Sequence, residues 1–201
     1  MKNYKSIKAK INKWYDSRIK EIKSGCSFCD YKSGVRLEKP TDRQQAAEVR
    51  RLEKKRAERL EFLERVANAP ALLSVSVVTD WVKNRTWGHN PHAFATITTT
   101  EGASRTEGRA SGCGYDKYSA AVTSAICHNP SVLRVLCENL NKLKKEGRYP
   151  HSCEVWDCCG MPTLCTNGSG IETLRGVFIC IGFKYEENRQ SRQTDFLRFW
   201  K

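Results

Sequence analysis

The chain has 201 residues, and its 35 Lys and Arg outnumber its 22 Asp and Glu, which gives a formal net charge of +13. That length suits one domain, or one domain with an appendage, and a hydrophobic content of 39% excludes full disorder. No apolar run approaches the roughly 18 residues of a membrane span. The basic start has no apolar region after it, so we expect no secretory signal and a cytoplasmic protein that does not insert into membranes.

Two polar helices are predicted before Pro70. Isoleucine and aromatic residues recur at three- and four-residue steps over residues 3–23, and Ser24-Gly25 can end this helix. Thr41 or Asp42 can cap a second helix that continues to about Ala69, with a glutamine in its first turn. Each helix has one narrow apolar stripe, so we expect the two to pair as an antiparallel hairpin.

After Pro70 the apolar pattern changes to the period of strands. Strands are predicted at residues 73–78, 93–99, 105–110 and 173–185, and helices at 117–127 and from Pro130 to Gly147, the latter capped by Asn129. The tail at 194–200 is expected to be an edge strand or a short docked helix. These elements predict an α+β fold, with an N-terminal antiparallel helical hairpin (1–70) followed by a small antiparallel sheet packed with two helices (71–201).

The excess charge is concentrated in the first helix. Residues 1–70 hold 19 Lys+Arg and 10 Asp+Glu, whereas residues 71–201 hold 16 and 12. The second helix is largely compensated by pairs such as Glu48/Arg51, but residues 1–24 keep an excess of +6. This pattern is typical of nucleic-acid binding, and an acidic protein surface is the alternative partner. The predicted contact residues are Lys2, Lys5, Lys8, Lys10, Lys13, Arg18, Lys20 and Lys23.

A second candidate site lies in the segment of small residues from 102 to 119. Arg105 and Arg109 are four residues apart and share one face of a regular strand. The free N–H groups of the helix start that follows could hold a phosphate or a carboxylate. The alternative is a strand-to-helix corner capped by Asp116 with two exposed arginines. A site for a nucleotide or another anion would comprise Arg105, Arg109, Ser111, Gly112, Gly114, Lys117, Trp87 and His89.

The same segment carries two resemblances. Its helix start resembles the Gly-x-Gly-x-Ser-Lys-Lys start of double-stranded-RNA-binding domains, with Lys117 matching, Asp116 in place of the serine and Tyr118 in place of the second lysine. The run Ala-Ser-Gly-Cys-Gly-Tyr-Asp-Lys-Tyr-Ser-Ala-Ala-Val, residues 110–122, resembles a segment in proteins of phages and mobile elements of gut bacteria, over roughly residues 85–185. That resemblance implies no particular activity. It implies a setting in which small basic accessory proteins counter host defences, as anti-CRISPR-like inhibitors do.

Cysteine and histidine give two further hypotheses. Cys26 and Cys29 have the spacing of half a zinc knuckle, and free thiols in a reducing cytosol are the alternative. The second half of a zinc site would have to come from the turn-rich segment that holds His151, Cys153, Cys158, Cys159 and Cys165. His89 or His92 could act as a general base, although no nucleophile is tied to either by spacing.

Together these patterns favour a non-enzymatic, basic accessory protein that binds nucleic acid or a nucleic-acid–protein complex. A small-ligand binder that uses the Arg105 strand is the second hypothesis, and a histidine-dependent enzyme is the third. Zinc is the one cofactor considered, and the oligomeric state stays open.

Overall fold

The computed structural model describes residues 2–31, 33–84, 88–109, 117–148, 153–155, 164–166, 170–188 and 194–201. Packing divides the described chain into two compact units, one up to Arg65 and one from Val66 onward. Each unit is described by itself. Among the described residues, every helix is too short or too polar to cross a membrane.

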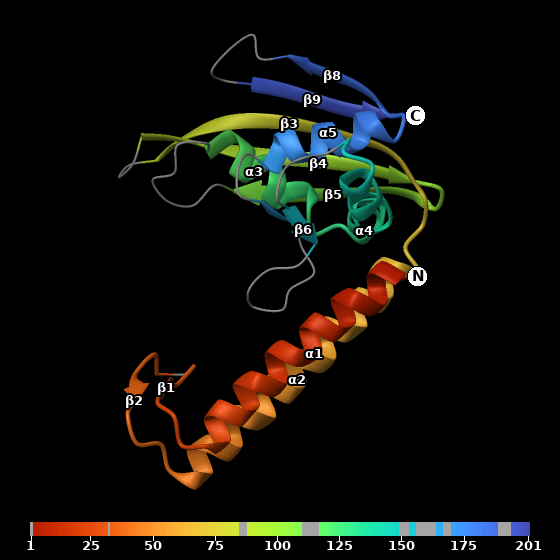
Figure 1. The fold of residues 1–201 in the computed structure, drawn as a ribbon. Coiled ribbons are helices and arrows are strands. Elements are labelled where there is room, and N and C mark those ends of the chain that lie inside the picture. The colour runs from red at the N-terminus through yellow and green to blue at the C-terminus, as the bar shows by residue number, and fades with distance from the viewer. Residues whose placement is uncertain are drawn as a thin grey trace. The chain divides into compact units, whose positions relative to one another are not determined.

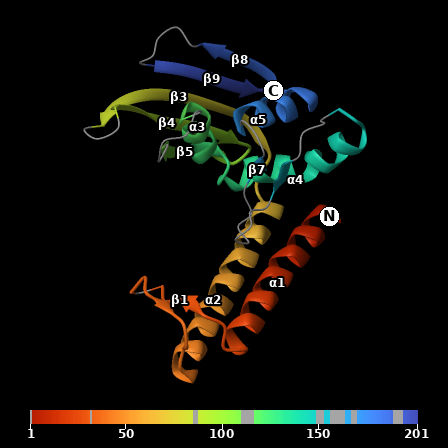
Figure 2. The same cartoon turned by 60° about the vertical axis from the view of Figure 1, so that its left-hand side comes forward.

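The first unit is a pair of antiparallel helices, α1 (Lys2–Lys23) and α2 (Asp42–Ala67), which lie side by side in both views (Figure 1, Figure 2). Each helix buries one apolar stripe, represented by Ile11 and Tyr15 in α1 and by Leu52 in α2. An ion pair joins the two helices, with Arg56 Nη1 donating to Asp16 Oδ1 at 2.7 Å. The predicted helical hairpin is therefore confirmed.

Local interactions fix the ends of these helices. Thr41 and Gln44 form a capping box at the start of α2, with Gln44 N–H donating to Thr41 Oγ1 at 3.3 Å and Thr41 N–H donating to Gln44 Oε1 at 2.9 Å. Gly25 takes a φ of +81° after α1, a conformation that favours glycine. Between the helices, β1 (Phe28–Cys29) and β2 (Arg36–Leu37) form a short antiparallel hairpin.

The second unit is built on a five-stranded antiparallel sheet with the strand order β5-β4-β3-β9-β8. A separate two-stranded sheet pairs β6 (Cys153–Val155) with β7 (Leu164–Thr166). The helices are α3 (Lys117–Ile126), α4 (Pro130–Lys145) and α5 (Gly170–Cys180). The strands of the large sheet are β3 (Leu72–Asn84), β4 (Gly88–Thr99), β5 (Gly102–Arg109), β8 (Lys184–Asn188) and β9 (Thr194–Trp200).

The core of this unit lies between one face of the large sheet and the helices (Figure 1). Alternate strand residues such as Val77, Ile97 and Phe199 are fully buried, as are Leu136 and Phe178 on the helices. Asn129 caps α4 as predicted, since its Oδ1 accepts hydrogen bonds from the first free N–H groups of that helix. The mixed α+β architecture is confirmed.

Two predictions for the last third of the chain are wrong. The strand predicted over residues 173–185 is helix α5 followed by a turn and β8, because Leu174, Val177 and Phe178 recur at helical spacing and are buried together. Residues 194–200 do form a strand, but β9 lies between β3 and β8 and is not an edge strand. The sheet is therefore packed with three helices instead of two.

Candidate nucleic-acid interface

One face of the five-stranded sheet has no described helix packed against it. Directly opposed residues of antiparallel strands project to the same face, and Val78 is opposed by Phe94 on β4 and by Phe196 on β9. Phe94 is 43% exposed and Val78 is 40% exposed, although both are large apolar side chains in central strands. We call Phe94, Val78 and Phe196 the apolar row, and the face that carries it the open face.

A polar row lies next to the apolar row, two residues away from it on each strand. Thr96 is opposed by Arg105 on β5 and by Ser76 on β3, and Ser76 is opposed in turn by Arg198 on β9. Because neighbouring strands lie about 4.8 Å apart, the two arginine backbones are about 14 Å apart, with two small hydroxyl side chains between them. We call these four residues the arginine row.

A third row lies beyond the arginine row, on the side away from the apolar row. It contains Trp200 of β9, which is half-buried. The guanidinium carbon of Arg198 lies 5.2 Å from the centre of the Trp200 ring, a cation–π contact. Lys184 on β8 is opposed to Trp200 and is exposed. The open face thus combines aromatic rings with cations on neighbouring strands, and it also carries carboxylates, Glu107 opposed to Phe94 and Glu186 opposed to Arg198.

On the other side of the apolar row, His92 and Arg109 are opposed to each other and form a cluster with Glu107, which is opposed to Phe94 at the β5 end of the apolar row itself. Arg109 donates to the Glu107 carboxylate from Nε at 2.8 Å and from Nη2 at 2.7 Å, and His92 contacts the same carboxylate through Nε2. The His92 ring also packs against Phe94, with ring centres 4.5 Å apart. The bond from Arg109, and then that from His92, hold the pKa of Glu107 below its usual range.

The Glu107 carboxylate partly neutralises the charge of Arg109 through these hydrogen bonds. The Arg109 side chain is nevertheless 75% exposed. Arg105 and Arg109 lie on one face of β5, as expected from their spacing, and Glu107 lies between them on the same face. Arg105 therefore carries the less compensated charge of the two.

The first unit presents a separate basic surface on α1. Both acidic side chains of that helix are paired with arginine, Asp16 with Arg56 and Glu21 with Arg18 at 2.6 Å. Lys10 is half-buried, and Lys2 is the first residue of the helix. We call the exposed members of the set the exposed α1 lysines: Lys5, Lys8, Lys13, Lys20 and Lys23.

Part of the predicted small-ligand site lies outside the described residues, namely Trp87, Ser111, Gly112 and Gly114. His89 belongs to β4, and Lys117 is the first residue of α3. The structure thus places Arg105 and Arg109 on the open face and leaves the rest of that site a prediction.

The predicted zinc half-site lies in the first unit. Cys26 and Cys29 are exposed free thiols, and within the described ranges no three potential ligands come together as a metal site. His151, Cys158 and Cys159 lie outside the described residues, and Cys153 and Cys165 belong to β6 and β7. Zinc stays a prediction.

Sequence reasoning missed the open face as a unit, because it depends on β8 and β9 lying beside β3. The alternation of Phe196, Arg198 and Trp200 along β9 is the signal that could have suggested it. Comparison of the chain with protein-family models, with curated proteins and with solved structures finds no match.

Proposed function

We propose that the protein binds single-stranded nucleic acid on the open face of its five-stranded sheet. The observation that carries the proposal is the apolar row of Phe94, Val78 and Phe196 beside the arginine row. Unstacked bases pack on exposed aromatic rings with little dependence on sequence, and arginines bind the phosphates between them. Both kinds of group are present here on neighbouring rows.

The arrangement favours single strands over duplexes. A duplex hides the flat faces of its bases inside the stack, so the rings of Phe94 and Phe196 would have no base to pack against. A single strand can lay its bases on the apolar row and its phosphates towards Arg105 and Arg198. The exposed α1 lysines of the first unit form a separate basic surface that would attract a polyanion independently of its sequence.

A nucleoprotein complex is a narrower target that fits this chemistry. Support for that target, and for a role in countering host defence, comes from the resemblance of residues 110–122 to proteins of phages and mobile elements. An acidic protein surface is the alternative partner, and it would not need exposed aromatic rings.

Fluorescence anisotropy with labelled oligo(dT), oligo(rU) and a duplex tests the proposal. We expect both single strands to bind more tightly than the duplex, and Phe94→Ala to weaken them by about 1–3 kcal/mol, or roughly 5- to 150-fold. Ile179→Ala is the matched control, because Ile179 is an apolar side chain of the same unit, 49% exposed on α5.

A second pair of variants tests the arginine row. Arg105→Ala removes a cation of the open face, and Lys145→Ala removes an exposed cation from α4 of the same unit. We expect only Arg105→Ala to weaken binding and to lower the salt dependence. Tighter binding of the duplex, or equal losses from both members of either pair, would contradict the proposal.

A further inference from the structure

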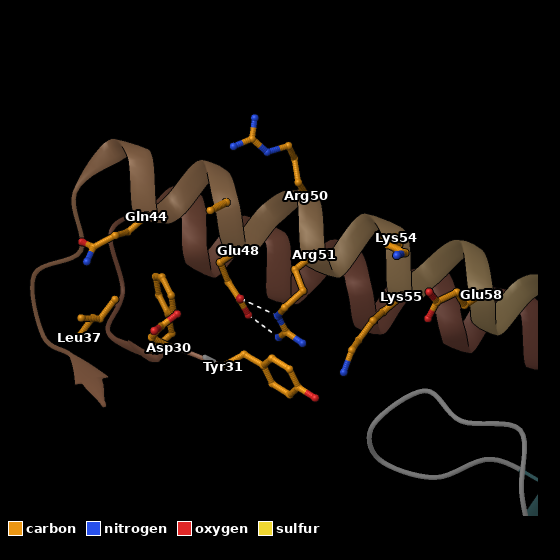
Figure 3. Close-up of a pocket in the computed structure, with 12 residues that line it drawn as sticks. Asp30, Tyr31, Leu37, Gln44, Glu48, Arg50, Arg51, Lys54, Lys55 and Glu58 are labelled. Carbon is orange, nitrogen blue, oxygen red and sulfur yellow. Dashed lines mark hydrogen bonds and ion pairs between the residues drawn. The ribbon is translucent and has the colours of Figure 1, made fainter. Parts of the chain in front are cut away.

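The first unit contains a groove of about 540 Å³ between the β1–β2 hairpin and the first half of α2 (Figure 3). The apolar side chains of the lining gather at one end of the groove, where Asp30 and Gln44 also lie (Figure 3). Phe28 is buried at 5% exposure, Leu37 is half-buried, and Ala47 of the same lining is exposed on α2. This volume falls in the range of sites that accept a large side chain or a small ligand.

The other end of the groove is cationic and contains an unusually exposed ring. Tyr31 is 70% exposed, and its ring centre lies 5.0 Å from the guanidinium carbon of Arg51 and 4.9 Å from Lys55 Nζ. Glu48 is only 9% exposed and accepts two hydrogen bonds from Arg51, at 2.7 Å and 2.5 Å (Figure 3). This pairing holds the guanidinium against the Tyr31 ring and raises the pKa of Arg51.

We propose that this groove binds an acidic segment of a partner protein, with one large apolar side chain at the Phe28 end and carboxylates at the Lys55 end. Lys55 is directed towards Tyr31 (Figure 3), and within the part of the chain that the structure describes it forms no ion pair. Glu58 lies near this end as well, but a short peptide can place a carboxylate beside Lys55 without following the rest of the lining. Its apolar side chain then covers surface that water contacts in the free protein.

The lining disfavours a nucleic-acid strand in the groove. Asp30, Glu48 and Glu58 also line it, so a chain with one phosphate per nucleotide would meet carboxylates along its path. The groove therefore differs from the open face of the sheet, and the proposal does not rest on the function proposed for that face.

Two tryptophan substitutions on α2 test the site. Ala47→Trp fills the apolar end of the groove, whereas Ala57→Trp adds the same side chain at an exposed α2 position outside the groove lining. An array of short peptides, each with several Asp or Glu residues and one Leu, Phe or Trp, is probed with the full-length protein. Peptides with Ser in place of the apolar residue, and labelled oligo(dT), are measured in parallel.

We expect acidic peptides with an apolar residue to bind, and Ala47→Trp to weaken them about tenfold or more while Ala57→Trp leaves them unchanged. Lys55→Glu should abolish the preference for acidic over neutral peptides. The proposal is overturned if no acidic peptide binds, if Ala47→Trp has no effect, or if Ala47→Trp removes oligo(dT) binding and leaves peptide binding intact. Circular dichroism of each variant shows whether lost binding comes from a blocked groove in a folded protein or from unfolding.

Discussion

Replacement of Gly108 by alanine tests the packing that supports the open face. A Cβ atom at Gly108 would lie 2.2 Å from the Ala121 carbonyl oxygen and 2.3 Å from the Ala125 nitrogen, both backbone atoms of α3. Real Cβ atoms keep at least 3.0 Å from such neighbours. Strand β5 and helix α3 must therefore move apart, because neither contact involves a side chain that could rotate away.

The cost of this movement can be estimated from two terms. Overpacking of a tightly packed contact costs about 1–3 kcal/mol. The Thr106 hydroxyl donates to the Ala125 carbonyl at 2.5 Å, and its loss would add about 1 kcal/mol. We expect Gly108→Ala to lower the free energy of unfolding of the second unit by about 2–4 kcal/mol.

Urea unfolding followed by circular dichroism measures this loss, with Ser104→Ala as the control. Ser104 lies on the same strand and is exposed, so its substitution should change stability by less than about 0.5 kcal/mol. The same Gly108 variant should bind oligo(dT) more weakly, since Arg105 is carried by β5. A Gly108→Ala protein as stable as the Ser104→Ala control would refute the close approach of β5 to α3.

Three further predictions concern charge and thiols. Glu107→Gln should tighten oligo(dT) binding and steepen its salt dependence in anisotropy titrations, because Arg109 loses its carboxylate partner. The pKa of Glu107 is lowered on folding, so its pairing stabilises the protein above the unfolded pKa. That contribution to stability is lost as the pH falls through the pKa of Glu107 in the folded protein. Protonation of Glu107 should then tighten oligo(dT) binding by the wild-type protein but not by Glu107→Gln. Replacing the exposed α1 lysines by glutamate should flatten the salt dependence of oligo(dT) binding while circular dichroism stays unchanged; an unchanged slope would remove α1 from the interface. Burial raises the pKa of the Cys137 thiol to about 12, so a thiol-reagent titration at neutral pH should modify Cys137 only after denaturation, whereas Cys26 should react in the folded protein.

The two helices of the first unit were predictable from sequence because their ends and apolar faces are set by local interactions, whereas the β1–β2 hairpin between them was not predicted. The periodic isoleucines of α1, the Thr41–Gln44 capping box and the stop at Gly25 all act within a few residues of the chain. Helix α4, with Asn129 as its cap, was predictable for the same reason.

The wrong and missed predictions concern segments whose structure is decided by packing between residues far apart in the chain. Residues 170–180 have a short apolar run that fits a buried strand or a buried helix, and its burial between α3, α4 and the sheet selects the helix. The open face is built from strands that are separated by three helices in the chain, so no local pattern could show that Phe196 lies next to Val78. Arg105 and Arg109 were found because their relation depends only on strand alternation.

The distribution of charge and of apolar surface also explains why two binding surfaces should be tested with separate variants. A deletion of residues 1–24 would remove the exposed α1 lysines, but it would also uncover the apolar stripe of α2 around Leu52. Loss of binding in such a protein would therefore report unfolding as readily as lost charge. Lysine-to-glutamate substitutions change the charge of α1 and leave Ile11 and Tyr15 in place. Ala47→Trp changes neither the charge of α1 nor its apolar stripe. If the lysine variants weaken oligo(dT) binding without affecting acidic peptides, and Ala47→Trp does the reverse, the first unit carries two independent surfaces, and one protein can hold a nucleic acid and a protein partner at the same time.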